Sequence, residues 1–139
     1  MNKNSISFAS SVSHDKNFDP MDTLLFCKAN AVNNAQLYMD KKLLNNRDKI
    51  VQIAKFAKEN SIALLCHSPV SLNSSIVNKK LISAFNELLK YHEEKKIVIH
   101  YDPDVSIADS MMSIESLINA GLVVCLENFY PNQDQIAQI

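Results

Sequence analysis

Five short apolar runs, each about as long as a β-strand, alternate with helical patterns along this chain of 139 residues. The runs begin about 25 to 35 residues apart, which is the length of one strand and one helix together. This alternation favours a parallel sheet, because consecutive parallel strands need a crossover helix between them. The predicted strands span Ser5–Ser10, Ala35–Met39, Ile62–His67, Ile97–His100 and Leu122–Glu127.

The helical patterns between these strands begin with recognisable capping residues. Asp19 followed by Pro20 is typical of an N-cap and a first helical position. A second helix is predicted after Asn45-Asn46, and a third carries apolar residues at helical spacing around Phe85.

The fourth predicted helix has both ends marked. Ser106 and Asp109 form the pattern of a capping box, and Gly121 is typical of the position just after a helix. Its apolar residues recur at helical spacing, so we expect this stripe to lie in the core, with Met112 beside it. The stripe consists of Ile107, Met111, Ile114 and Ile118.

Gly121 is also the only glycine of the chain. Phosphate-binding loops, dinucleotide fingerprints and nucleophile elbows each need several glycines, so these site classes are excluded. The formal net charge of -1 predicts no uniformly basic surface for nucleic acid or an anionic membrane.

The cysteines and the amino terminus indicate a reducing compartment. Cys27, Cys66 and Cys125 are far apart and lie in apolar contexts, which predicts buried free thiols. The first residues lack the charged and apolar regions of a signal peptide, and no run of 18 apolar residues occurs. We therefore expect a cytoplasmic protein without a membrane partner.

The two faces of the predicted sheet differ in polarity, because side chains alternate along a strand. One face is apolar, whereas the other becomes polar where the strands end, at His67, His100 and Glu127. The same alternation puts Gln36 and Tyr38 on the polar face. A doubly wound sheet would need apolar residues on both faces, whereas a barrel packs helices outside and keeps its active site at the strand ends.

The predicted fold class is therefore α/β, with parallel strand–helix units that form the first five strands of a TIM-type barrel. Residues 1–139 read as a single, partial domain without an internal linker. A full barrel needs about eight units and roughly 250 residues. We therefore expect either a truncated barrel or one whose other half comes from elsewhere.

Two imidazoles and one carboxylate at neighbouring strand ends would meet at one side of the barrel mouth. His67, His100 and Glu127 offer the nitrogen and oxygen ligands that divalent metal ions prefer. Each histidine alone could equally be a strand-end residue bonded to a loop. Glu127 ends an apolar run, where a buried carboxylate needs a partner or a metal. Gln36 and Tyr38 could bond a polyhydroxylated ligand, and His92 is expected at a helix end, where it complements the helix dipole.

Three segments resemble strand ends of a known superfamily. CHSP (66–69), IVIHYDP (97–103) and VCLEN (124–128) resemble the third, fourth and fifth strand ends of the xylose-isomerase-like barrels. That superfamily contains sugar isomerases, sugar epimerases and type IV abasic-site endonucleases. Two departures stand out: Tyr101-Asp102-Pro103 replaces the usual residues after the fourth-strand histidine, and the ligands from strands six to eight are missing from this sequence.

The resemblance implies roles for the residues at these strand ends. In the endonuclease branch His67, His100 and Glu127 would all be metal ligands. In the isomerase and epimerase branch Glu127 would be the metal ligand, with His67 and His100 nearer the substrate. Asn128 would orient Glu127 without touching the metal.

The expected function is a divalent-metal-dependent isomerase or epimerase of a small sugar or sugar derivative, acting as part of a full barrel. The metal would be Mn²⁺, Zn²⁺, Co²⁺ or Mg²⁺, and Glu127 is the first candidate catalytic residue. The alternative is metal-dependent phosphodiester hydrolysis at abasic DNA sites, the one case in which nucleic acid would be a partner. A third hypothesis is a chain without activity of its own that forms a homo-oligomer along its open edge.

Overall fold

The structure, a computed structural model, describes residues 7–9, 19–71, 79–100 and 104–127. The five predicted strands and four predicted helices are present, and a short helix that the sequence did not predict, α2, follows the second strand. The predicted ends of the first strand, Ser5 and Ser10, lie outside the described residues. The elements are β1 Ser7–Ala9, α1 Pro20–Ala29, β2 Asn34–Tyr38, α2 Lys41–Leu44, α3 Arg47–Glu59, β3 Ala63–Ser71, α4 Lys79–Leu88, β4 Lys96–His100, α5 Ile107–Asn119 and β5 Val123–Glu127.

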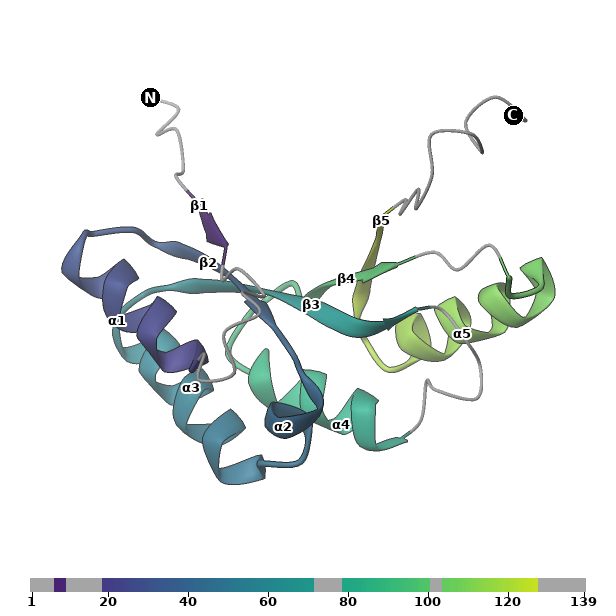
Figure 1. Cartoon of the computed structure of the whole chain (residues 1–139), viewed down its shortest axis with the longest axis horizontal. Helices are drawn as coiled ribbons and strands as arrows, with labels where there is room; N and C mark the ends of the chain where they lie inside the picture. Colours follow the sequence, from purple (N-terminus) through teal and green to yellow (C-terminus); the bar gives the residue numbers. More distant parts are fainter. Residues whose placement is uncertain (1–6, 10–18, 72–78, 101–103, 128–139) are drawn as a thin grey trace.

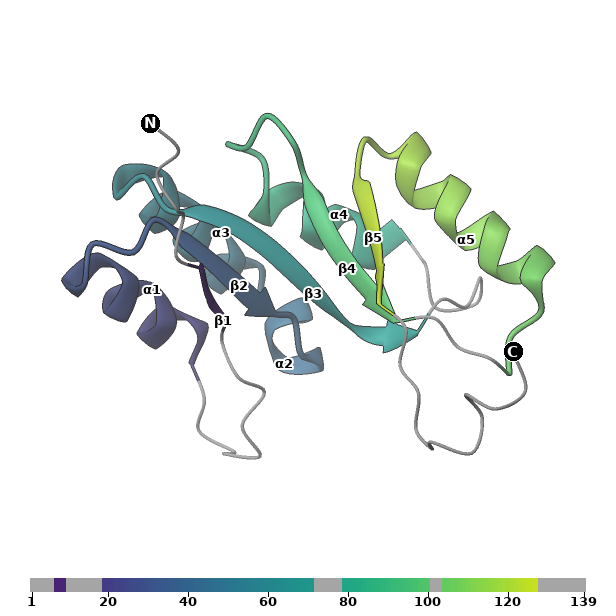
Figure 2. The ribbon, with the colours of Figure 1, turned by 90° about the horizontal axis from the view of Figure 1, so that it is seen from above.

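The strands form one parallel sheet in the order β1-β2-β3-β4-β5, as Figure 2 shows from above. Each strand lies beside the next strand in the chain, so the order never reverses. A doubly wound sheet would contain such a reversal, with helices on both faces. Here the helices lie on one side of the sheet, below it in Figure 1. The prediction of an α/β fold with the strand–helix units of a barrel is therefore confirmed.

Alternation along the strands separates a core from a second face, called here the uncovered face because no helix of the described residues lies on it. On the helix side Leu37, Cys66 and Ile99 are buried. On the opposite face the strand-end side chains of Tyr38 and His67 are partly exposed. The polar face predicted from the sequence is therefore the face on which none of the described helices lies.

The helices begin where the sequence predicts. The side chain of Asp19 accepts a hydrogen bond from the Met21 amide at 2.9 Å, and Asn46 caps α3 in the same way. Ser106 accepts from the Asp109 amide at 3.1 Å and donates to the Asp109 carboxylate at 2.8 Å. These bonds satisfy amides that have no partner within their own helix.

The predicted core stripe of α5 is wrong. The helix turns Ser110, Ser113 and Leu117 toward the sheet, and these side chains are buried. The stripe lies about a quarter of a turn away, because neighbouring positions of a helix are about 100° apart. Ile114 is partly buried, but the rest of the predicted stripe is exposed, as is Met112: Ile107, Met111 and Ile118.

Two of the three cysteines are buried as predicted and one is not. Cys27 and Cys66 lie in the core, and burial raises the pKa of the Cys66 thiol. Cys125 is exposed, because its position in β5 turns it to the uncovered face. Among the described helices, none is long and apolar enough to cross a membrane.

Candidate metal centre

The side chains of His67, His100 and Glu127 meet at the carboxyl ends of β3, β4 and β5. One ligand atom from each residue can be chosen so that all three atoms lie within 4.8 Å of one another. The sheet register explains this meeting. His100 pairs directly with Glu127, while His67 lies opposite Val98, two residue pairs earlier, and its ring reaches forward.

An irregularity in β3 fixes the orientation of the His67 ring. The pairing of β3 with β4 shifts between His67 and Ser71, where a bulge interrupts the ladder. The bulge leaves the Ser68 carbonyl 3.0 Å from His67 Nδ1. Because a carbonyl oxygen and a carboxylate oxygen can only accept, Nδ1 donates to Ser68 and Nε2 donates to Glu127, and a metal ion bound at Nε2 would take the place of the hydrogen there. A backbone carbonyl that orients a metal-binding imidazole in this way is common at metal sites.

Glu127 is the electrostatic centre of the cluster. Its Oε2 lies 2.8 Å from His67 Nε2 and 3.8 Å from His100 Nδ1. The hydrogen bond from His67 holds the pKa of Glu127 below its ordinary value, and positive charge on the two histidines acts in the same direction. The Glu127 side chain is 51% exposed, so the expectation of a buried carboxylate is wrong. β5 is an edge strand of the described sheet, and no described helix lies on the face that carries Glu127.

The donor set fits a divalent cation. Two imidazole nitrogens and one carboxylate oxygen are ligands that Zn²⁺ and similar ions accept, and three protein ligands leave a coordination position for water or substrate. The cluster opens toward the uncovered face of the sheet, from which such a molecule would enter. The metal-binding roles of His67, His100 and Glu127 stay predictions.

Tyr38 lies beside the cluster, in register with His67. The centroid of its ring is 5.6 Å from that of His67, which in turn is 4.7 Å from that of His100, so three rings follow one another across the strand ends. Burial, together with the negative charge of Asp40, raises the pKa of Tyr38, so the phenol keeps its hydrogen at neutral pH. It can therefore donate a hydrogen bond to a hydroxyl group of a ligand.

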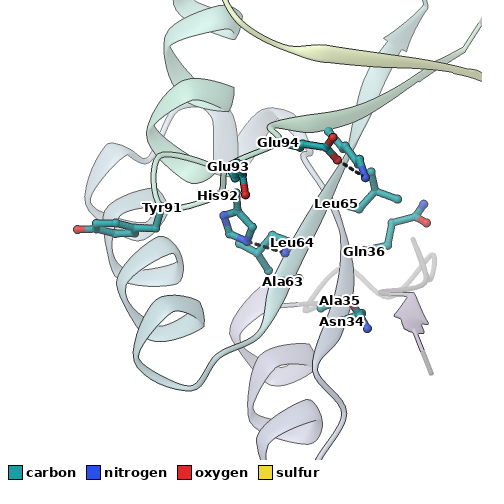
Figure 3. A pocket seen from close by; sticks show the side chains of 11 residues that line it. Asn34, Ala35, Gln36, Ala63, Leu64, Leu65, Tyr91, His92, Glu93 and Glu94 are labelled. Carbon is teal, nitrogen blue, oxygen red and sulfur yellow. Dashed lines mark hydrogen bonds and ion pairs between the residues drawn. The ribbon is translucent and has the colours of Figure 1, made fainter. Parts of the chain in front are cut away.

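Gln36 and Asn128 are not placed at the cluster. Gln36 lies two residues before Tyr38 on the same face and lines a separate cavity with Asn34 and Glu94 (Figure 3). The structure therefore does not bring Gln36 to the histidine–glutamate cluster. Asn128, predicted to orient Glu127, lies outside the described residues.

Ser68 is the residue that sequence reasoning missed. Its role rests on a main-chain carbonyl, which residue type does not reveal. A signal was nevertheless present: Pro69 follows it, and a proline in a strand cannot donate to the ladder, so a bulge is expected there.

Comparison with known proteins shows the fold. No family model matches the sequence, and no curated protein matches it. A solved xylose isomerase domain protein from Planctomyces limnophilus is similar, with 13% identity and a TM-score of 0.50 over 96% of this chain and 57% of that chain. A D-psicose 3-epimerase solved in the presence of D-fructose matches with 13% identity and a TM-score of 0.48, over 79% of this chain and 47% of that chain.

The chain thus spans about half the length of these solved structures. At such low identity the likeness bears on the fold alone. The likeness supports the α/β fold of parallel strand–helix units, and the assignment of these units to the first five strands of a xylose-isomerase-like barrel stays a prediction.

Proposed function

We propose that this chain carries metal-binding strand ends of a divalent-metal-dependent isomerase or epimerase that acts on a small sugar or sugar derivative as part of a full barrel. The observation that carries the proposal is the meeting of His67, His100 and Glu127 at the ends of three successive parallel strands. The barrel-type fold supports it, because such enzymes keep their active sites at this end of the strands.

Each residue of the cluster has a definite task under this proposal. A bound divalent ion would polarise a carbonyl and a hydroxyl of the sugar. Glu127 binds with an oxygen that stays ionised well below neutral pH, since its pKa is lowered. The Ser68 carbonyl holds His67 so that Nε2 points to the site, and Tyr38 bonds a sugar hydroxyl.

Isomerisation and epimerisation also need a group that takes a proton from carbon and returns one. Within the part of the chain that the structure describes, Glu127 is the carboxylate of the cluster. It is therefore the first candidate for the base.

One observation favours a second function, hydrolysis of phosphodiesters at abasic DNA sites. Two histidines adjoin Glu127, and neutral imidazoles are preferred ligands of zinc. The net charge of -1 counts against DNA as a partner, because phosphate contacts need lysine and arginine.

The first experiment measures metal content. The purified protein is loaded with Mn²⁺ or Zn²⁺, desalted and analysed, next to Glu127→Gln and to Glu115→Gln, which neutralises an exposed carboxylate on α5 outside the cluster. We expect Glu127→Gln to weaken metal binding by at least about tenfold, in line with losses at other metal sites, and Glu115→Gln to bind as the unchanged protein does. Equal binding by all three proteins would refute the metal site.

The second experiment separates the candidate functions. Conversion of aldoses, ketoses or their derivatives by the metal-loaded protein supports the isomerase or epimerase. Cleavage of abasic DNA, with binding that weakens as salt rises, supports the hydrolase. Metal binding without either reaction leaves the third hypothesis, a chain without activity of its own.

A further inference from the structure

His92 makes a contact that neither the metal cluster nor its expected role at a helix end explains. Helix α4 ends at Leu88, so His92 lies beyond it, in the turn of residues 89–95 that leads to β4. Its Nε2 lies 2.8 Å from the backbone nitrogen of Leu64, near the beginning of β3. Figure 3 shows the ring directed at this strand.

The position of Leu64 explains why a side chain is needed there. The Ala63 amide donates to Asn33 on the β2 side, so the next amide, that of Leu64, faces the β4 side. Pairing between β3 and β4 begins only at Cys66 and Ile97. The His92 ring therefore accepts the hydrogen bond that a strand would otherwise accept.

This bond exists only when the ring is neutral. A backbone amide always donates, so Nε2 must offer a lone pair and Nδ1 must carry the hydrogen. Nδ1 is buried and has no well-aligned acceptor within the described residues. A proton added to Nε2 would point at the Leu64 N–H, and the two hydrogens would repel each other.

We propose that His92 is an acid-released latch that joins the turn of residues 89–95 to the beginning of β3 and lets this end of the sheet open when the ring takes up a proton. The latch lies at the opposite end of the strands from the candidate metal centre. It also borders a cavity of about 770 Å³, so the opening would widen a space that already exists. The inference does not depend on the proposed function.

The groups around His92 determine the pH range in which the ring takes up a proton. Burial lowers the pKa of His92 below its ordinary value, although the carbonyls of Ile62 and Leu89 favour the charged ring. The charged and titratable groups around the same cavity are those of the turn and of β4, whereas β2 and β3 contribute neutral side chains. Those groups are Tyr91, Glu93 and Glu94 in the turn and Lys96 in β4, with Glu94 and Lys96 paired at 2.6 Å.

The sign of the pH effect follows from this lowered pKa. A group that is harder to protonate in the folded protein than in the unfolded chain costs stability once the unfolded chain takes up protons. The contribution of the latch is therefore complete above the ordinary histidine pKa of about 6.5 and is lost as pH falls.

The test compares two replacements with the unchanged protein by denaturant unfolding and by amide exchange of Leu64 at pH 7.5 and pH 5. His92→Gln can still accept the bond but does not titrate, and His92→Leu removes the acceptor. We expect the Leu64 protection factor of the unchanged protein to fall by up to about tenfold per pH unit below the pKa of the ring. It should stay nearly constant in His92→Gln and be low at both pH values in His92→Leu.

His100→Gln removes another histidine, at the opposite end of the strands, and serves as the control, in which the Leu64 amide should behave as in the unchanged protein. Equal pH dependence of Leu64 in the unchanged protein and His92→Gln would overturn the proposal. If the variants do not fold, NMR titration of His92 in the unchanged protein decides. A ring pKa below about 6.5, with loss of Leu64 protection at the same pH, supports the latch, and a higher pKa overturns it.

Discussion

The central strands of the sheet and its β5 edge differ in how well the helices cover them. Between β2 and β4 the helices bury large side chains completely, as at Leu37, Phe85 and Ile99. At β5 the covering helix α5 contributes mostly small residues, and Leu126 is half exposed. The candidate metal centre spans this boundary: the His67 side chain is 12% exposed, and that of Glu127 is much more open.

This difference implies that the cluster is held in two ways. The histidines are positioned by the packed strands and, for His67, by the Ser68 carbonyl. Glu127 stands on the less covered strand and is held by its bond to His67. A change in the packed part should therefore affect stability, while a change at the open part should act locally.

The largest effect is expected from Phe85→Ala in the packed part. Phe85 is completely buried in α4, and removing its ring leaves a cavity that the surrounding strands cannot fill. We expect a loss of about 3–5 kcal/mol in the free energy of unfolding, measured with urea. A loss below about 1 kcal/mol would mean that this region is as loosely packed as the β5 end, and the contrast would fail.

The second prediction compares the ends of α3 and α5. After α3, Ser61 adopts a φ of 54°, and after α5, Gly121 adopts a φ of 82°. The amides that follow form the same bonds to the preceding turn at both ends, Ile62 to Ala57 and Leu122 to Leu117. The same backbone shape is thus built with serine in the packed part and with glycine in the open part.

Left-handed backbone costs a non-glycine residue about 1–2 kcal/mol, a cost that glycine avoids. Glycine offsets part of this advantage, because it raises the conformational entropy of the unfolded chain. Ser61→Gly should therefore raise the free energy of unfolding by about 0.5–1 kcal/mol, and Gly121→Ala should lower it by about 1 kcal/mol. A Cβ at Gly121 would meet no atom within 4 Å, so this loss reports on the backbone alone. Opposite signs in thermal or urea unfolding are the expected result, and equal signs would contradict it.

The same helix ends show which structural features could be predicted from the sequence. It predicted the end of α5 because glycine marks the left-handed position, but Ala31 and Ser61 adopt that conformation without such a mark. It also missed α2, because the four residues Lys41–Leu44 are too few to show a helical period. Local signals therefore locate an element when its end is marked by a residue type with a strong preference.

At the site, alternation along the strands was sufficient to place His67, His100 and Glu127 at one end of the sheet. It could not show the bulge at Ser68 or the exposure of Glu127, since both depend on contacts between strands and on what covers them. For the same reason the spacing of apolar residues in α5 revealed a stripe but not its direction.

A third prediction concerns the bond that holds Glu127. The pKa of Glu127 is below its ordinary value because of the hydrogen bond from His67, so it should rise toward about 4.3 in His67→Ala. In the unchanged protein the bond stabilises the fold at a pH above the ordinary pKa of glutamate, and this contribution is lost as the pH falls through the lowered pKa. NMR titration of the Glu127 carboxyl carbon measures both values. An unchanged pKa would show that His67 does not hold the carboxylate.

The smallest effect is expected on the exposed stripe of α5. Met111 is 50% exposed, and glutamine has a similar helix propensity, so Met111→Gln should change the free energy of unfolding by less than about 0.5 kcal/mol. Leu117→Ala, on the buried side of the same helix, should cost about 2–5 kcal/mol. Because the two residues share one helix, the difference between their losses of stability measures how much the buried side of α5 contacts compared with its exposed side. A loss above about 1 kcal/mol for Met111→Gln would mean that another surface covers the stripe in solution. In that case the β5 edge would not be more open than the central strands.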